Sequence, residues 1–177
     1  MKIGLSLVAI LVVSVSLAAQ GKITKENVPG ITNLARLETT VACSGAIKPE
    51  SVPEIKKMGF ASIINLRLAN EQGANVEAEE AAAKAAGINY VHVPFNGAMP
   101  EASSVDRFLQ AVKDGKNNPA FIHCAAGNRA AAMWFIKRTV VDKWDNDRAM
   151  EEATQLGYNQ LPALKTFVQD YVQSHKK

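Results

Sequence analysis

A cysteine and an arginine lie at the two ends of one short segment of this chain. The segment His123-Cys124-Ala125-Ala126-Gly127-Asn128-Arg129 follows the apolar run 120–122 and precedes the apolar run 130–136. This order predicts a strand that ends at Cys124, then a tight loop, then a helix that begins near Arg129. The N–H groups of such a loop, the positive end of the helix and the guanidinium together form an oxyanion receptor. The same charges favour the thiolate, which is the nucleophilic form of a cysteine.

The alternative is that Cys124 is a small, buried and inert side chain, which is the commoner state of a cysteine in an apolar run. Here the apolar run stops at Cys124. Small residues and Gly127 follow, and these suit a tight loop better than a core. The reactive interpretation therefore takes precedence.

The first residues of the chain have the pattern of an export signal. Lys2 is followed by an apolar run over residues 3–17, and Ser16 and Ala18 have the small-x-small order of a cleavage site. We therefore predict a cleavable signal peptide over residues 1–19 and a periplasmic or secreted mature protein. An uncleaved membrane anchor is the alternative, but the apolar run is short for crossing a bilayer.

The rest of the chain is predicted to contain a flexible lead-in over residues 20–29 and a single domain over residues 30–177. The formal net charge of +3 is too small to favour nucleic acid or an anionic membrane surface. We expect no nucleic acid partner and no stable membrane association after signal cleavage. No His, Cys, Asp and Glu set has metal-ligand spacing, and no nucleotide-binding fingerprint occurs, so neither a metal nor another cofactor is expected.

Strand-like and helix-like patterns alternate along the domain. Strands are expected at residues 31–37, 41–43, 61–66, 88–95 and 120–122, and helices at 49–58, 75–86, 101–114, 129–141, 145–156 and 161–175. The alternation predicts a three-layer α/β domain with a central, mostly parallel sheet flanked by helices. Such sheets bind ligands at the carboxyl ends of their strands, which is where Cys124 is expected.

The strand–His-Cys-loop-Arg–helix unit resembles the cysteine-based protein phosphatases of the dual-specificity and tyrosine type. More closely, it resembles the bacterial phosphatase-like domain that some proteins carry fused to a beta-lactamase-like hydrolase. The features typical of that family appear in order as Ile31–Leu37, Ser44-Gly45, Ile63–Arg67, Val93–Phe95 and the loop 123–129. The resemblance spans about Val28 to Gly157 and implies a cysteine-phosphatase-like fold.

The resemblance also implies roles for the loop residues. Cys124 would attack phosphorus and form a phosphocysteine, and Arg129 would bind two phosphate oxygens. The remaining N–H donors to phosphate would come from Ala125, Ala126, Gly127, Asn128 and Arg129. His123 would be buried, would fix the loop through backbone hydrogen bonds, and would support the low pKa of the Cys124 thiol. The implied substrate is a phosphorylated small molecule or protein.

Some positions differ from the usual phosphatase pattern. Four residues separate Cys124 from Arg129, one fewer than usual, and this shorter loop is similar to that of rhodanese sulfurtransferases. Ala130 replaces the usual Ser or Thr, and Asn96 replaces the Asp that acts as general acid. Losing a general acid costs ~10²–10⁴-fold in rate, and least for aryl phosphates. A sulfurtransferase with a Cys124 persulfide and a catalytically weak oxyanion-binding module therefore remain alternatives.

Residues outside the loop add further candidates. Glu101 and Asp106 are alternative acids if the loop over residues 97–100 folds over the site, although first-turn acids are ordinarily stabilised by the helix dipole. Arg67 is expected at a strand end on the same rim as the catalytic loop. There it binds an anion, holds Glu71 in place, or forms a surface ion pair.

Cys43 is the second cysteine of the chain. It precedes the Ser44-Gly45 turn, which in the related fold approaches the loop that contains Cys124. One interpretation is a reversible disulfide between the two cysteines, which would protect the nucleophile in an oxidising compartment. The other is a buried, unreactive thiol.

Overall fold

The computed structural model describes residues 21–175, so the predicted signal peptide over residues 1–19 lies outside the described residues. The strands are β1 (Ile23–Val28), β2 (Ile31–Leu37), β3 (Val41–Ser44), β4 (Ser62–Asn65), β5 (Asn89–His92) and β6 (Ala120–His123). The helices are α1 (Val52–Lys57), α2 (Val76–Ala86), α3 (Ala102–Lys113), α4 (Asn128–Ile136), α5 (Asn146–Gln155) and α6 (Pro162–His175). None of the helices formed by residues 21–175 combines the length and apolar composition that crossing a bilayer requires.

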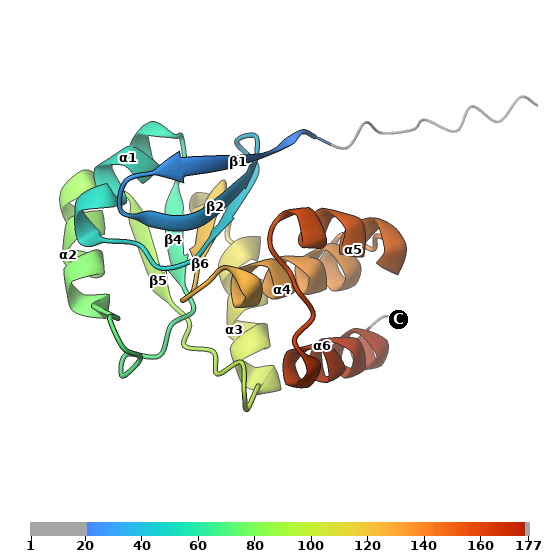
Figure 1. The fold of residues 1–177 in the computed structure, drawn as a ribbon. Helices are drawn as coiled ribbons and strands as arrows, with labels where there is room; N and C mark the ends of the chain where they lie inside the picture. The colour runs from blue at the N-terminus through green and yellow to red at the C-terminus, as the bar shows by residue number, and fades with distance from the viewer. Residues whose placement is uncertain (1–20, 176–177) are drawn as a thin grey trace, which may run out of the picture.

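The strands form one mixed sheet in the order β1-β2-β3-β6-β4-β5. Strands β3, β6, β4 and β5 run parallel to one another. Strand β2 pairs antiparallel with β3, and β1 pairs antiparallel with β2. Helices α1 and α2 cover one face, and α3 to α6 cover the other (Figure 1). The predicted three-layer α/β fold with a mostly parallel sheet is therefore confirmed.

The predicted flexible lead-in over residues 20–29 is wrong for residues 23–28, which form the strand β1. This strand pairs with β2 through a tight turn at Pro29-Gly30, in which Gly30 has a φ of +83°. Proline followed by a glycine with positive φ is typical of a type II turn. Because β1 is a half-exposed edge strand with polar side chains, it has no clear apolar alternation for a sequence pattern to detect. Because β1 pairs with it, β2 is an inner strand of the sheet.

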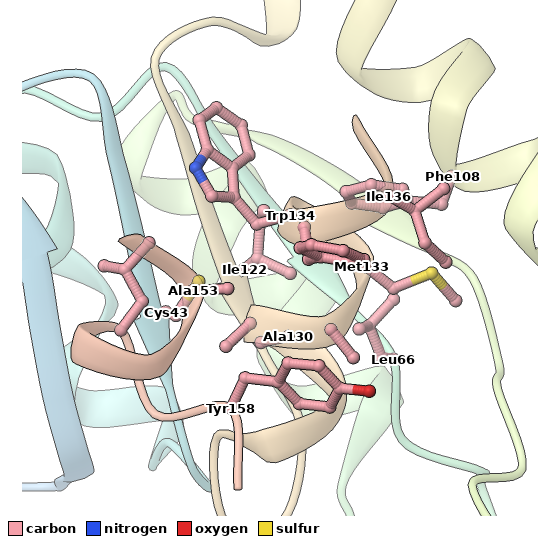
Figure 2. Packing of buried hydrophobic residues seen from close by; sticks show 14 of the residues in the cluster. Cys43, Leu66, Phe108, Ile122, Ala130, Met133, Trp134, Ile136, Ala153 and Tyr158 are labelled. Atoms are coloured by element: carbon pink, nitrogen blue, oxygen red, sulfur yellow. The ribbon is translucent and has the colours of Figure 1, made fainter. Parts of the chain in front are cut away.

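The central strand β6 leads directly into the strongly apolar helix α4. Residues 130–136 are all buried, and α4 lies between the sheet and helices α5 and α6. Figure 2 shows Ile122 of β6 among the α4 side chains Ala130, Met133 and Trp134. A helix that is apolar all round must be buried on all sides. The core therefore fixes both ends of the loop over residues 124–129, hereafter the signature loop.

Candidate active site

The signature loop wraps around the sulfur of Cys124. Cys124 follows β6 and is 1% exposed, and its Sγ accepts a hydrogen bond from the backbone N–H of Gly127 at 3.1 Å. Gly127 has a φ of +100°, a left-handed conformation that a residue with a Cβ rarely adopts. The turn at Gly127 therefore directs a backbone N–H donor towards the sulfur, as an oxyanion cradle requires.

Neighbouring segments bind the signature loop from its outer side. The carbonyl oxygen of Ala125 accepts from the N–H of Ala46 at 3.0 Å, and that of Ala126 accepts from Nδ2 of Asn33 at 3.2 Å. These contacts turn the two carbonyl oxygens away from the sulfur. Since peptide groups are planar, they favour inward-pointing N–H groups between the bound carbonyls. The chemical roles of the loop N–H groups remain predictions.

Gly45 allows the β3 end to approach the signature loop closely. A Cβ at position 45 would lie 2.9 Å from the carbonyl oxygen of Ala125 and 3.1 Å from the Cα of Ala126. Both are backbone atoms, so a side chain here forces the loop to shift. We expect Gly45→Ala to destabilise the protein by about 1–3 kcal/mol and to lower any activity of the loop. Urea titration measures the first effect.

Gly115 provides the matched control for that substitution. A Cβ at Gly115 meets nothing within 4 Å, and its φ is not in the left-handed region. Gly115→Ala should leave the midpoint of unfolding nearly unchanged. An equal loss of stability in both variants would contradict the importance of the close approach at Gly45.

His123 is buried, as expected, but it does not hold the signature loop. Its Nε2 lies 3.2 Å from Oε2 of Glu79 on α2, and its ring nitrogens make no hydrogen bond within residues 21–175. Successive side chains of a strand point to opposite faces. Cys124 packs on the α4 side of the sheet, so His123 points to the α2 side. The expected hydrogen bonds from His123 to the loop are therefore wrong.

Asn128 begins α4 and closes the loop on its other side. Its Oδ1 accepts a hydrogen bond from the backbone N–H of Asn159 at 2.8 Å. The side chain of Asn128 is thus used to fasten the segment between α5 and α6 to the signature loop. Its backbone N–H remains a predicted phosphate donor.

Arg129 is held by a network of acceptors. Its Nη1 and Nη2 donate to the two carboxylate oxygens of Glu71 at 2.6 and 2.8 Å, and Nη1 also donates to the carbonyl oxygen of Phe95 at 2.8 Å. Within residues 21–175, the Nε–H and the second Nη2–H have no oxygen acceptor, and the Cys124 sulfur lies close to the guanidinium. Burial lowers the pKa of Arg129, but Glu71 and the nearby sulfur of Cys124 outweigh burial and raise it. The unused edge of the guanidinium has the two parallel donors that bind an oxyanion.

Glu71 and Arg67 form the support for Arg129. Arg67 is 3% exposed; its Nη1 and Nη2 donate to the carbonyl oxygens of Gly73 and Gln72, and its Nε lies 3.4 Å from Glu71 Oε2. Arg67 therefore holds Glu71 in place, and the expectation of a surface ion pair is wrong. Burial raises the pKa of Glu71, but hydrogen bonds, chiefly from Arg129, bring it to about 2. The sequence analysis named Glu71 only as a partner of Arg67 and did not predict its contact with Arg129.

The Glu71–Arg129 pair predicts a pH-dependent contribution to stability. We expect Glu71→Gln to lower the free energy of unfolding at neutral pH by about 1–3 kcal/mol, because it removes a partly buried carboxylate from its partner. A carboxyl with a depressed folded-state pKa stabilises above its unfolded value and ceases to do so as the pH falls through its folded value. The difference from wild type should be complete above about pH 4.5 and should shrink towards pH 2.

Urea titrations at neutral pH and at pH 3 measure this difference. Glu80→Gln is the control, because Glu80 is exposed on α2 and should have little effect at either pH. A Glu71→Gln penalty that is equally large at both pH values would contradict the assignment.

Asn96 organises the loop that faces Arg129. Its Oδ1 accepts hydrogen bonds from the N–H groups of Ala98 and Met99 at 3.0 and 3.3 Å. A Cβ at Gly97 would lie 3.3 Å from the Cδ and Cγ atoms of Arg129, so this loop packs directly on the arginine side chain. The side chain of Asn96 therefore shapes one wall of the site.

The two alternative acids are not equivalent in the structure. Asp106 accepts a hydrogen bond from the hydroxyl of Tyr171 at 2.6 Å, which ties α3 to α6 and commits this carboxylate to packing. This contact favours the ordinary role of a helix acid for Asp106 over the alternative of a general acid. Glu101 is exposed before the first turn of α3, and its Oε2 lies 3.4 Å from the hydroxyl of Ser103.

Cys43 lies on the same side of the sheet as Cys124, and both cysteines are free and buried. Burial raises the pKa of Cys43 well above its ordinary value, and the neighbouring Cys124 and Glu152 add to this. Cys43 pairs with Ile122, two residues before Cys124. A strand spacing of about 4.8 Å and a rise of about 3.3 Å per residue put the two Cα atoms about 8 Å apart. Disulfides rarely span more than about 7 Å, so the unreactive thiol is favoured.

A thiol count tests this directly. After air oxidation, the denatured protein should still contain two titratable thiols, because backbone movement is needed to join Cys43 and Cys124. An intramolecular disulfide formed under mild oxidation would contradict the distance argument.

The chain matches a known family in sequence. Residues 33–141 match the family described as beta-lactamase hydrolase-like protein, phosphatase-like domain. Beta-lactamase hydrolase-like proteins of Agrobacterium fabrum and Xylella fastidiosa strain Temecula1 are 30% identical over 104 residues and 29% identical over 121 residues. The matches cover 57% and 67% of this chain but only 24% and 27% of the relatives. The chain thus spans about a quarter of the length of these relatives.

Solved structures share the fold. A protein of Shewanella putrefaciens CN-32 superposes with a TM-score of 0.69 at 21% identity, covering 84% of this chain and 96% of that one. TpbA of P. aeruginosa gives 0.66 at 20% identity, covering 86% and 92%. The core catalytic domain of the S. cerevisiae PP-IP phosphatase SIW14 gives 0.62 at 17% identity, covering 80% and 84%. At these identities the likeness shows a common fold, that of the cysteine phosphatases.

The resemblance seen in the sequence is therefore confirmed at the level of family and fold. The signature loop, the Arg129 network and the turn that contains Gly45 all lie inside the matched range. This chain belongs to the phosphatase-like domain family of the beta-lactamase hydrolase-like proteins.

Proposed function

We propose that this protein is a cysteine-dependent phosphatase that hydrolyses phosphomonoesters through a phosphocysteine on Cys124. The observation that carries the proposal is the position of the Cys124 sulfur. It accepts the N–H of Gly127 and lies beside an arginine whose Nε/Nη2 edge is unused by its other contacts. A nucleophile and donors for the transferred group are thus assembled in one loop, which is what phosphoryl transfer needs.

The proposed reaction has two steps. In the first, the thiolate of Cys124 attacks phosphorus, the P–O bond to the leaving group breaks, and the leaving oxygen takes a proton from water. In the second, water attacks phosphorus, loses a proton to solvent, and the thiolate departs as phosphate forms. Arg129 and the loop N–H groups bind the equatorial oxygens throughout. Because Asn96 cannot donate a proton as an acid, esters with good leaving groups are the preferred substrates.

Solved structures that share this fold support a phosphorylated substrate. One crystal structure of P. aeruginosa TpbA is a complex with phosphotyrosine, and SIW14 is described as a PP-IP phosphatase. We infer that the substrate of this chain is likewise a phosphorylated small molecule or protein. We also propose that the protein is exported, from the signal-like pattern of residues 1–19. Cell fractionation and the N-terminal sequence of the mature protein test the export.

The second candidate function is sulfur transfer. The short spacing between Cys124 and Arg129 favours it, because a persulfide sulfur needs a smaller cradle than a phosphoryl group. Assaying the purified protein with an aryl phosphate, and separately with thiosulfate plus cyanide, distinguishes the functions. Phosphate release supports the proposal and thiocyanate formation supports sulfur transfer. Silence in both assays with retained phosphate binding supports a catalytically weak oxyanion-binding module.

A further inference from the structure

A cluster of buried polar side chains lies between α2 and the sheet (Figure 1). Asn65 ends β4, and its Nδ2 donates to Oε2 of Glu79 on α2 and to the hydroxyl of Tyr90 on β5, both at 2.8 Å. The same Glu79 oxygen accepts from the Tyr90 hydroxyl at 2.9 Å and lies 3.2 Å from Nε2 of His123. The proposed reaction uses none of these side chains, so the cluster calls for a separate explanation.

Stability alone does not account for a carboxylate at this place. Asn65 and Glu79 are 0% and 1% exposed. Burying such groups costs free energy that hydrogen bonds must offset, and apolar side chains of the same size fill a core without that cost. A connected polar cluster, by contrast, holds its members in one arrangement. The useful question is therefore which arrangement the cluster fixes.

The cluster fixes the orientation of the Asn65 amide. A carboxylate only accepts hydrogen bonds, so the amide group that faces Glu79 is the NH₂. The oxygen of the amide is thereby directed away from Glu79, and it accepts the backbone N–H of Arg67 at 2.7 Å. A flipped amide would set its oxygen against the carboxylate and its NH₂ against the N–H of Arg67, so both contacts would be lost.

The amide of Asn65 in turn fixes the support of the catalytic arginine. Both backbone groups of Arg67 contact side chains, because Asn65 accepts its N–H and Nε2 of His92 lies 2.8 Å from its carbonyl oxygen. The side chain of Arg67 then holds Glu71. Glu71 spans the fork of Arg129 at 2.6 and 2.8 Å, so the place of the Arg67 backbone determines where this guanidinium lies.

The residue after Asn65 also contacts Arg129 directly. The carbonyl oxygen of Leu66 accepts from Nη1 of Arg129 at 3.3 Å, and the N–H of Leu66 donates to the carbonyl oxygen of His123 at 2.9 Å. The end of β4 is thus joined to β6 on one side and to the arginine on the other. A shift at Asn65 therefore reaches Arg129 by two routes.

We propose that Asn65 is a positioning residue for Arg129, and that Glu79 holds the Asn65 amide in the orientation that this role requires. The inference rests on the proposed function for its effect on turnover. Without the Asn65 oxygen, the N–H of Arg67 is buried without an acceptor, and the chain that carries Glu71 shifts to satisfy it. Phosphoryl transfer depends on donors that are already in place, so a displaced Arg129 lowers the rate.

NMR of the arginine side chains tests the position of Arg129 without any substrate. The guanidinium N–H signals of Arg129 are identified by their loss in Arg129→Lys. They should shift in Asn65→Ala and in Glu79→Leu, which removes the acceptor of the amide and should fold because it buries no charge. They should keep their wild-type positions in Glu79→Gln, whose oxygen still accepts from Asn65. Wild-type signals in Asn65→Ala and Glu79→Leu overturn the proposal.

Asn117→Ala is the matched control for the loss of a buried amide. Asn117 is 4% exposed, its Nδ2 donates to the carbonyl oxygen of Ala111 at 3.0 Å, and it precedes β6, whereas the signature loop follows that strand. This variant should unfold at a lower urea concentration but keep the Arg129 signals and kcat/KM of wild type. Arg129 signals that shift as much in Asn117→Ala as in Asn65→Ala also overturn the proposal.

Rates with an aryl phosphate show whether the effect on turnover passes through Arg129. Asn65→Ala should lower kcat/KM about tenfold in wild type, and about twofold or less in the Arg129→Lys background, where the fork is already lost. Equal losses in both backgrounds overturn the positioning role, because independent effects are additive. If wild type releases no phosphate while the Arg129 signals shift as expected, the proposed function fails and the positioning role stands.

Discussion

Replacing Cys124 with serine is expected to abolish phosphate release from an aryl phosphate, with kcat falling on the order of 10⁴-fold or more. The serine hydroxyl would occupy the position of the sulfur that accepts the Gly127 N–H. It would stay protonated, however, because no general base contacts this position within residues 21–175. Initial rates of phosphate release measure the effect, with orthophosphate binding by calorimetry as the check that the loop is intact.

Cys43→Ala is the matched control for that variant. Cys43 is fully buried in β3 and takes no part in the signature loop, so its loss should change kcat only a few-fold. The substitution should instead lower the free energy of unfolding, because it removes buried side-chain volume. Substantial phosphate release by the Cys124→Ser variant would show that another group performs the chemistry.

The second large effect is expected at Arg129. Arg129→Lys should lower kcat/KM by about 10²–10³-fold, because lysine keeps the charge but loses the paired donors. Arg129 also spans both oxygens of Glu71 and the carbonyl of Phe95 with a planar fork, which one ammonium group cannot reproduce. KM should rise and kcat should fall, since the oxyanion is bound in the ground state and in the transition state.

Arg107→Lys provides the control for general effects of such a substitution. Arg107 lies on α3, away from the signature loop, and its Nη2 donates to the hydroxyl of Ser104. This variant should keep kcat/KM within a few-fold of wild type. If Arg129→Lys were as active as Arg107→Lys, phosphate binding by the Arg129 fork would be wrong.

The part of the site that could be predicted from the sequence is the part made by local order. An apolar run, a cysteine, a glycine and a second apolar run define β6, the signature loop and α4 without reference to the rest of the chain. Helix α2 was predictable for the same reason. Asn75 accepts the N–H of Ala78 at its beginning, and Gly87 ends it in the left-handed conformation.

The contacts that could not be predicted are those between distant segments. Glu71 is 58 residues from Arg129, and the sequence offered only its spacing from Arg67 as a signal. By contrast, the orientation of the His123 side chain could be predicted, because side chains alternate between the two faces of a sheet along a strand. Adjacent strand residues point to opposite faces, so a nucleophile on one side places the preceding histidine on the other. The resemblance implied a role for His123 that strand geometry does not support.

The most direct test is to identify the atom that carries phosphorus during turnover. Rapid acid quench of the protein with an aryl phosphate, followed by digestion and mass spectrometry, should find one phosphoryl group on the peptide that contains Cys124. The adduct should be absent from the Cys124→Ser variant. Phosphate release without any phosphoryl adduct on Cys124, or an adduct on another residue, would contradict a phosphocysteine mechanism.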